Sequence, residues 1–331
     1  MSPAPEPEPE GGPAVMSRRQ LLRHTAWFGA AVVLTVTGGE VISHLGGTPQ
    51  PASAAVAADP NALRFVQISG SHLGFHGPAN TDVTGSFSRA IDQVNALGFR
   101  PEFVMHTGDL THLSTPAQFD QVRQMRGGLR TGQVFTVPGA HDGQVFTVPG
   151  AHDSVDDHGQ KYRATFGTGT HGDGWYSFDV KIVHVIALLN TLALEKLGHL
   201  GTDQLEFVRK DVAGLSSDTP IVVFSRIPLF AMYPAWGWGP DDATRALSYL
   251  RRFSSVTCLN HYLHPLFTKT EGNVTFYSAT TTAYSLPHPR QGPGPIPVTL
   301  PAGQLGAALG ICDVTYQTGQ QALAIRDRAL A

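Results

Sequence analysis

The sequence predicts an α/β domain in which strands and helices alternate and pack in layers. Short apolar, β-branched runs bounded by Gly, Pro or polar residues are typical of buried strands. They occur at residues 63–69, 103–107, 134–137, 184–189, 221–225, 256–259 and 273–278. Asp, His and Asn recur directly after these runs, which is where layered α/β proteins place their functional sites.

Four segments between the runs have the apolar spacing of helices: residues 87–97, 116–125, 202–212 and 243–253. Thr115 is the expected cap of the second, with Pro116 in its first turn, and Thr202 is the expected cap of the third. Residues 286–301 carry six prolines and predict a long strap without a helix. The tail from residue 317 is only weakly specified.

Composition limits the function classes. The chain has 331 residues, 41% of them apolar, which suffices for one large domain and its core. A net charge of −3 without a Lys/Arg-rich block argues against nucleic acid as a partner. The two cysteines, Cys258 and Cys312, are too few for a disulfide scaffold; they form either one bridge or two buried thiols.

Residues 1–57 read as a targeting segment and linker, followed by one domain over residues 58–331. Arg18 and Arg19 precede an apolar run at residues 26–37, and small-x-small cleavage candidates lie at residues 52–57. This arrangement resembles a twin-arginine export signal, which implies a periplasmic, cell-envelope or extracellular protein. The alternative is an uncleaved anchor, which would be the chain's only contact with a membrane.

An eleven-residue sequence, GQVFTVPGAHD, occurs twice in succession over residues 132–153. Only one copy can supply a strand and the loop that follows it. The first copy follows the expected upstream helix, whereas the second copy continues into the expected downstream sequence. Either copy could therefore form the strand and its loop, and we favour the second. Asp142 and Gly143 at the junction are a turn signal.

The polar groups after the strands form an ordered series: GSH from Gly70, GD from Gly108, GAHD from Gly139 or Gly150, SR ending at Arg226, and NHYLH ending at His264. This series resembles the motifs of the calcineurin-like metallophosphoesterase superfamily: D-x-H, GD, GNH[D/E], a lone His and GHxH. The resemblance covers roughly residues 63–282. It implies a four-layer α-β-β-α sandwich of two mixed sheets, and a centre in which two metal ions clamp the oxygens of a phosphoester.

Carried over one residue at a time, the pattern is incomplete. Of the metal ligands it keeps His72, Asp109 as the bridging carboxylate, and His264. The resemblance assigns a proton-donor role to His152 or His141, with Asp153 or Asp142 behind it to orient the ring. Gly70, Ala140 or Ala151, Arg226 and Tyr262 stand where four other ligands belong.

The losses fall mainly on one of the two ions. The three surviving ligands belong to the same ion, so we expect one divalent metal, Mn, Fe or Zn, or none, and not a full two-metal site. Arg226 is a candidate for binding a phosphoryl group, or a substitution without a role. The family pattern has a histidine at the position of Tyr262. His261 could replace it only if the segment shifted by one residue, because neighbouring residues of an extended segment point to opposite faces. His106 points either into the site or to its periphery.

The expected function is therefore that of an exported member of the phosphoric ester hydrolase lineage, acting on a phosphoester small molecule with weak or lost activity. The alternatives are a non-catalytic protein that binds a phosphate ligand or a protein partner, and a remnant without function.

Overall fold

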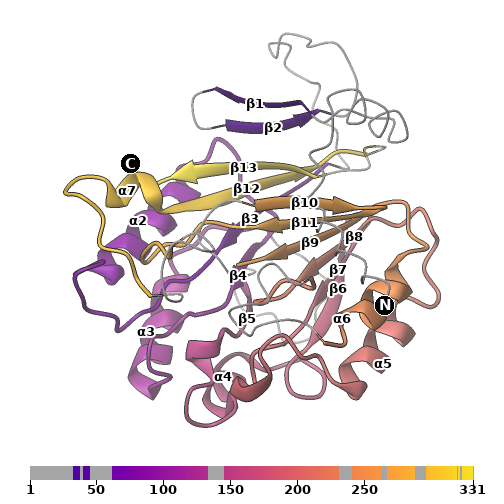
Figure 1. The fold of residues 1–331 in the computed structure, drawn as a ribbon, viewed down its shortest axis with the longest axis horizontal. Helices are drawn as coiled ribbons and strands as arrows, with labels where there is room; N and C mark the ends of the chain where they lie inside the picture. The colour runs from indigo at the N-terminus through magenta and orange to yellow at the C-terminus, as the bar shows by residue number, and fades with distance from the viewer. Residues whose placement is uncertain are drawn as a thin grey trace, which may run out of the picture.

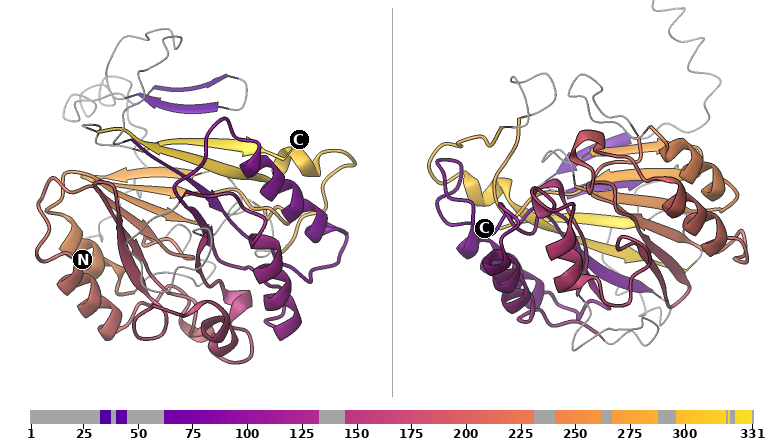
Figure 2. Two further views of the ribbon diagram at one scale, coloured as in Figure 1. Left: turned by 180° about the vertical axis from the view of Figure 1, so that it is seen from behind. Right: turned by 90° about the horizontal axis from the view of Figure 1, so that it is seen from below.

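The computed structural model describes residues 33–37, 40–44, 62–132, 145–230, 241–261, 267–287, 296–318, 320 and 323–330. Within them, two mixed sheets stack face to face and helices cover both outer faces (Figures 1 and 2). The four-layer α-β-β-α sandwich expected from the sequence is confirmed.

The first sheet has five strands in the order β13-β12-β3-β4-β5. Their bounds are β3 (Leu63–Ile68), β4 (Val104–Thr107), β5 (Val145–Val148), β12 (Gly310–Tyr316) and β13 (Ala324–Ala329). The central three, β3, β4 and β5, run parallel, and β12 pairs antiparallel with both β3 and β13. Parallel pairing brings the carboxyl ends of β3, β4 and β5 to the same edge.

The second sheet has six strands in the order β10-β11-β9-β8-β7-β6. Their bounds are β6 (Tyr176–Val180), β7 (Val183–Ala187), β8 (Ile221–Phe224), β9 (Val256–Asn260), β10 (Phe267–Glu271) and β11 (Val274–Ser278). Strands β7, β8, β9 and β11 are parallel, whereas β6 and β10 flank them antiparallel. Six of the seven runs expected as strands thus lie in the two sheets. The remaining run, residues 134–137, lies outside the described residues, and β5 is formed by residues 145–148 of the second repeat copy.

Three buried apolar clusters correspond to the three interfaces between layers. The cluster between the sheets includes Phe65, Phe103 and Phe224. The rings of Phe65 and Phe103 stack with centroids 4.6 Å apart, and Phe224 of the other sheet meets Phe65 edge-on at 5.8 Å. The outer clusters lie under the helices of each face.

The first sheet is covered by α2 (Val83–Asn95), α3 (Pro116–Arg126) and α4 (Gln160–Phe166), and the second by α5 (Thr202–Asp211) and α6 (Ala243–Leu250). A short α7 (Leu305–Ala308) precedes β12. Thr115 caps α3 as expected, since its hydroxyl accepts a hydrogen bond from the Gln118 amide at 3.3 Å. The expected cap of α5 was wrong: the helix begins at Thr202, and Gly201 is its cap.

Several elements were not expected from the sequence: β6, β10, β12, β13, α4 and α7. The weakly specified tail contains β13, which closes the edge of the first sheet. The described part of the strap at residues 286–301 contains neither helix nor strand, as expected. Cys258 and Cys312 are both free and buried, in different apolar clusters, which confirms the interpretation as two thiols.

Two further strands lie in the segment expected to be an export signal. β1 (Val33–Thr37) and β2 (Glu40–His44) pair antiparallel as a separate sheet, and β2 lies beside β13 (Figure 1). None of the helices in the described residues is long and apolar enough to cross a membrane.

Candidate functional site

The polar residues that follow the parallel strands meet at one edge of the sandwich. The loops after β3 and β4 are joined by backbone hydrogen bonds: Gly70 donates to the Gly108 carbonyl at 3.0 Å and His72 to the Asp109 carbonyl at 2.8 Å. His72 and Asp109 have positive φ angles of 42° and 52°, a region that costs non-glycine residues energy. Strained backbone held by surrounding bonds is common at functional sites.

The second copy of the repeat supplies the third loop. Residues 145–148 form β5 beside β4, with His106 opposite Thr147, and the next residues carry His152 and Asp153 into the site. The preference for the second copy is confirmed. The corresponding residues of the first copy, His141 and Asp142, lie outside the described residues, so a role for His141 stays a prediction.

Asp109 forms a buried ion pair with Arg226. The Arg226 Nε donates to Asp109 Oδ2 at 3.0 Å and its Nη2 makes a second, shorter bond to the same oxygen. The two side chains are 8% and 2% exposed. Burial by itself raises the pKa of Asp109, but the charges of Arg226 and His72 outweigh it and hold that pKa well below its ordinary value.

Two glycines make room for this pair. A Cβ at Gly108, where φ is +91°, would lie 2.8 Å from the Arg226 Cδ and from the Gly150 amide nitrogen. A Cβ at Gly150 would lie 2.0 Å from Asp109 Oδ1. The GD and GAHD glycines are therefore required by close approach of the third loop to Asp109.

His261 fills the space beside Gly70, where the family pattern has a liganding aspartate. A Cβ at Gly70 would lie 2.7 Å from His261 Nε2, and φ there is +55°. The His261 ring is fully buried and its Nδ1 lies 3.0 Å from the Ala279 carbonyl oxygen. His261 thus faces the centre from the Gly70 side, although the sequence favoured Tyr262 as the inward position; Tyr262 lies outside the described residues.

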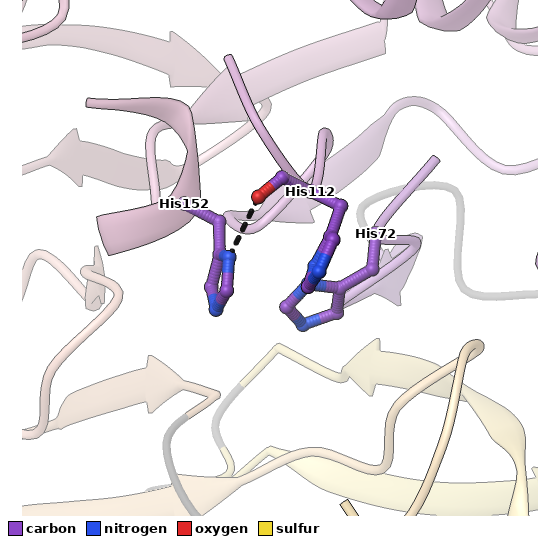
Figure 3. Close-up of side chains that lie close together, drawn as sticks. All are labelled: His72, His112 and His152. Atoms are coloured by element: carbon purple, nitrogen blue, oxygen red, sulfur yellow. Dashed lines mark hydrogen bonds between the residues drawn. The ribbon is translucent and has the colours of Figure 1, made fainter. Parts of the chain in front are cut away.

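The imidazoles of three residues gather close together, those of His72, His112 and His152 (Figure 3). One ring nitrogen from each lies within 4.8 Å of those of the other two. The His112 and His152 rings are stacked with centroids 4.9 Å apart, and His72 meets His152 edge-on at 4.7 Å. His72 Nε2 is also 3.5 Å from Asp109 Oδ2.

The orientation of His152 differs from the one expected. Its Nδ1 is 2.8 Å from the His112 carbonyl oxygen, so this nitrogen carries a proton and donates it there, and Nε2 is the nitrogen outside this bond. The Asp153 carboxylate instead accepts bonds from the amides of Leu110, Thr111 and Gly150. Asp153 therefore ties the loop after β5 to the loop after β4 and does not orient the His152 ring.

Asp153 is also unusual in its ionisation. Its carboxyl group is fully buried, and burial together with the nearby charge of Asp109 raises its pKa to about 6 despite the backbone donors. The three amides favour the carboxylate, but burial and Asp109 outweigh them, so in the folded protein this carboxyl group keeps its proton to a higher pH than a solvent-exposed one does.

His106 lies neither on the surface nor in the centre. Its ring is buried on the helix-covered side of β4, 5.9 Å from the Phe87 ring, and its Nε2 is 3.0 Å from the Ser71 hydroxyl. Burial lowers its pKa to about 3, so the ring is neutral. It supports the His72 loop from behind.

The buried ion pair bears on which metal ions the centre could hold. Both bonds from Arg226 end on Asp109 Oδ2, so a guanidinium already neutralises the carboxylate that would bridge two ions. Among the described candidates for one ion, His72 and Asp109 are adjacent, whereas His264 lies outside the described residues. His112, which the sequence pattern did not single out, completes a group of three imidazoles that could hold a metal.

Known structures share this fold. No protein-family model and no curated sequence matches the chain. A dimetal phosphatase from Danio rerio aligns with a TM-score of 0.56 and 12% identity over 81% of this chain and 96% of its own. A purple acid phosphatase from yellow lupin seeds aligns equally well, with a TM-score of 0.56 and 12% identity over 81% of this chain.

The chain spans about half of the lupin enzyme, since 52% of that protein is aligned. Identities this low show the fold alone. The resemblance noted in the sequence and the arrangement of the two sheets agree with each other, and the chain has the metallophosphoesterase fold.

Proposed function

We propose that this chain descends from exported metal-dependent phosphoesterases and hydrolyses phosphoesters weakly or not at all. The observation that supports this best is the buried ion pair between Arg226 and Asp109. A guanidinium carries one positive charge at a fixed place, and unlike a metal ion it offers no coordination position for an attacking water.

The charge of the centre supports the same conclusion. A second divalent ion on the Arg226 side of Asp109 would lie next to a cation whose only described carboxylate partner is Asp109 itself. It would also lack the Asn and His ligands, since Ala151 and Arg226 hold those positions. Without two ions, the clamp on both oxygens of an in-line displacement is missing, which removes several kcal/mol of transition-state stabilisation.

Some groups for phosphoester chemistry remain. His152 keeps a ring nitrogen free to exchange a proton, because its other nitrogen is fixed by the His112 carbonyl. Arg226 Nη1 is buried and has no hydrogen-bond partner among the described residues. These features support residual binding of a small phosphoester, the substrate class proposed here.

Export is part of the proposal and rests on the paired arginines at Arg18 and Arg19 and the apolar run after them. Fusing residues 1–57 to a reporter that is active only outside the cytoplasm tests it. Replacement of both arginines by lysine should abolish export, and unchanged export would remove this part of the proposal.

The activity is tested on the purified full chain. We expect fewer than two equivalents of bound metal by elemental analysis. With a nitrophenyl phosphomonoester or phosphodiester and added manganese, we expect turnover far below the ~1–1000 s⁻¹ typical of enzymes. Two tightly bound ions together with turnover in that range would refute the proposal.

A further inference from the structure

We propose that His72, His112 and His152 form a mononuclear site for a borderline divalent cation, with zinc as the preferred ion. This inference rests on the proposed function in one respect: it takes the two-ion centre to be lost. It replaces the ligand set implied by the sequence pattern, in which His112 and His152 have no place as ligands.

The three histidines come from three different loops, after β3, β4 and β5, yet one nitrogen of each lies within 4.8 Å of the other two (Figure 3). Zinc–imidazole bonds are about 2.1 Å long, so bound nitrogens would lie roughly 3.4 Å apart. The χ2 torsion of histidine is broad, so the stacked His112 and His152 rings can rotate to bring their nitrogens closer to this separation.

Two of the rings already have the outer partners that metal-bound histidines require. A ligating histidine usually donates its second N–H to an oxygen, which sets the tautomer and holds the ring. His152 Nδ1 does this to the His112 carbonyl at 2.8 Å. His72 Nδ1 lies 3.1 Å from the Tyr284 hydroxyl, which leaves Nε2 on the side of Asp109.

The third ring has an open buried nitrogen. His112 Nδ1 is inaccessible to solvent and has no hydrogen-bond partner among the described residues. A buried polar atom without a partner is costly, and a bound cation would satisfy it.

Electrostatics and donor type select the ion. Asp109 Oδ2 lies 3.5 Å from His72 Nε2, between the cluster and the Arg226 guanidinium, so the carboxylate shields an incoming cation from Arg226. Three imidazole nitrogens suit zinc, whereas manganese and magnesium prefer oxygen ligands. We therefore expect zinc to bind much more tightly than manganese.

The test is direct metal binding by the full chain after removal of metal with a chelator. Calorimetric titration with zinc gives stoichiometry and affinity, and cobalt(II) absorption in the visible range reports tetrahedral nitrogen coordination. His112→Gln and His152→Gln remove proposed ligands. His264→Gln removes the ligand of the family pattern, and His76→Gln, at an exposed position four residues after His72, is the matched control.

We expect one zinc per chain, at least tenfold weaker binding in His112→Gln and in His152→Gln, and less than threefold change in His264→Gln and His76→Gln. Loss of an outer partner alone typically costs about 10- to 100-fold in metal affinity, so loss of a ligand should exceed tenfold. Circular dichroism confirms that each variant is folded; if one ligand variant is not, the other decides.

Absence of zinc binding by the unmodified chain, or less than tenfold loss in a folded ligand variant, would overturn the inference. A loss in His264→Gln as large as that in His112→Gln would also overturn it, in favour of the family ligand set. The proposed function fails separately, through a second equivalent of metal and rapid hydrolysis.

Discussion

Replacing Arg226 with Met removes one member of the buried ion pair and keeps most of the packing of its side chain. Asp109 would then be a carboxylate with 2% exposure whose remaining contacts are the His152 amide at 3.1 Å and His72 Nε2 at 3.5 Å. Removing one partner of a buried pair costs about 3–5 kcal/mol, because the other charge stays buried. Because these two contacts remain, we expect Arg226→Met to lower the free energy of unfolding by about 3 kcal/mol, the lower end of this range.

A free energy of this size should lower the melting temperature by roughly 6–12 °C. The assay is urea denaturation at pH 7 with a chelator present, for Arg226→Met, Asp109→Asn and the double variant. Because the double variant buries neither charge, it should be more stable than the sum of the single effects predicts, with a coupling of about 2 kcal/mol.

The pH dependence supplies an independent check. The pKa of Asp109 is held well below its ordinary value in the folded protein, so the stabilisation it provides is present above the unfolded pKa and disappears only under strongly acidic conditions. Without Arg226, burial raises the Asp109 pKa, and the group can protonate as the pH falls. The difference between the unmodified chain and Arg226→Met should therefore shrink from pH 7 to pH 5. A coupling below ~0.5 kcal/mol, or a difference that grows on acidification, would refute the reasoning.

Three further changes test other parts of the structure. The His184 ring nitrogens lie 2.8 Å from Asp211 and 2.7 Å from Asp179. Burial by itself lowers the pKa of His184, but the two carboxylates outweigh it and raise that pKa. The stability gained from the ion pairs is therefore complete below pH 6.5 and is lost as the pH rises through the folded pKa. Asp211→Asn should therefore cost about 2 kcal/mol at pH 5.5 and less at pH 9 in urea denaturation, and equal costs would contradict the role of charge. Deleting residues 133–143 leaves one copy of the repeat. The variant should still unfold cooperatively, and the shorter connection should raise its free energy of unfolding by up to about 1 kcal/mol. A decrease of more than ~2 kcal/mol in the free energy of unfolding would mean that the first copy is needed. Gly70→Asp should lower the melting temperature, because the new side chain meets His261 at a positive φ, and an unchanged melting temperature would show that His261 moves aside without cost.

Much of the sandwich could be predicted from local sequence. Runs such as residues 221–225 and 256–259 are short and largely apolar, and all their side chains within β8 and β9 are buried. The capped helix α3 was equally visible, since Thr115 and Pro116 act within one turn. In contrast, β12 pairs with β3, which lies more than 240 residues earlier in the chain, and no local pattern reports such a partner.

The candidate site also has a part that could be predicted from the sequence and a part that could not. His72, Asp109, His152 and Arg226 were named from the sequence, because their order after successive strands could be compared with the family motifs. The bonds that Asp153 accepts from the Leu110 and Thr111 amides were not foreseen, since these residues meet only when the loops after β4 and β5 are placed side by side. His112 has no counterpart in the family motifs, so the sequence did not mark it as a ligand.

The sequence by itself determined which residues differ from the family's ligand pattern, and with them the expectation that a full two-metal centre is absent. Only the tertiary structure decided what took their place: Arg226 on Asp109, His261 beside Gly70, and His112 facing His152. The physical reason is that side-chain identity and strand pattern are local properties, whereas charge pairing and metal coordination depend on distances of a few ångströms between loops of different strands. Those distances are set by how the two sheets pack.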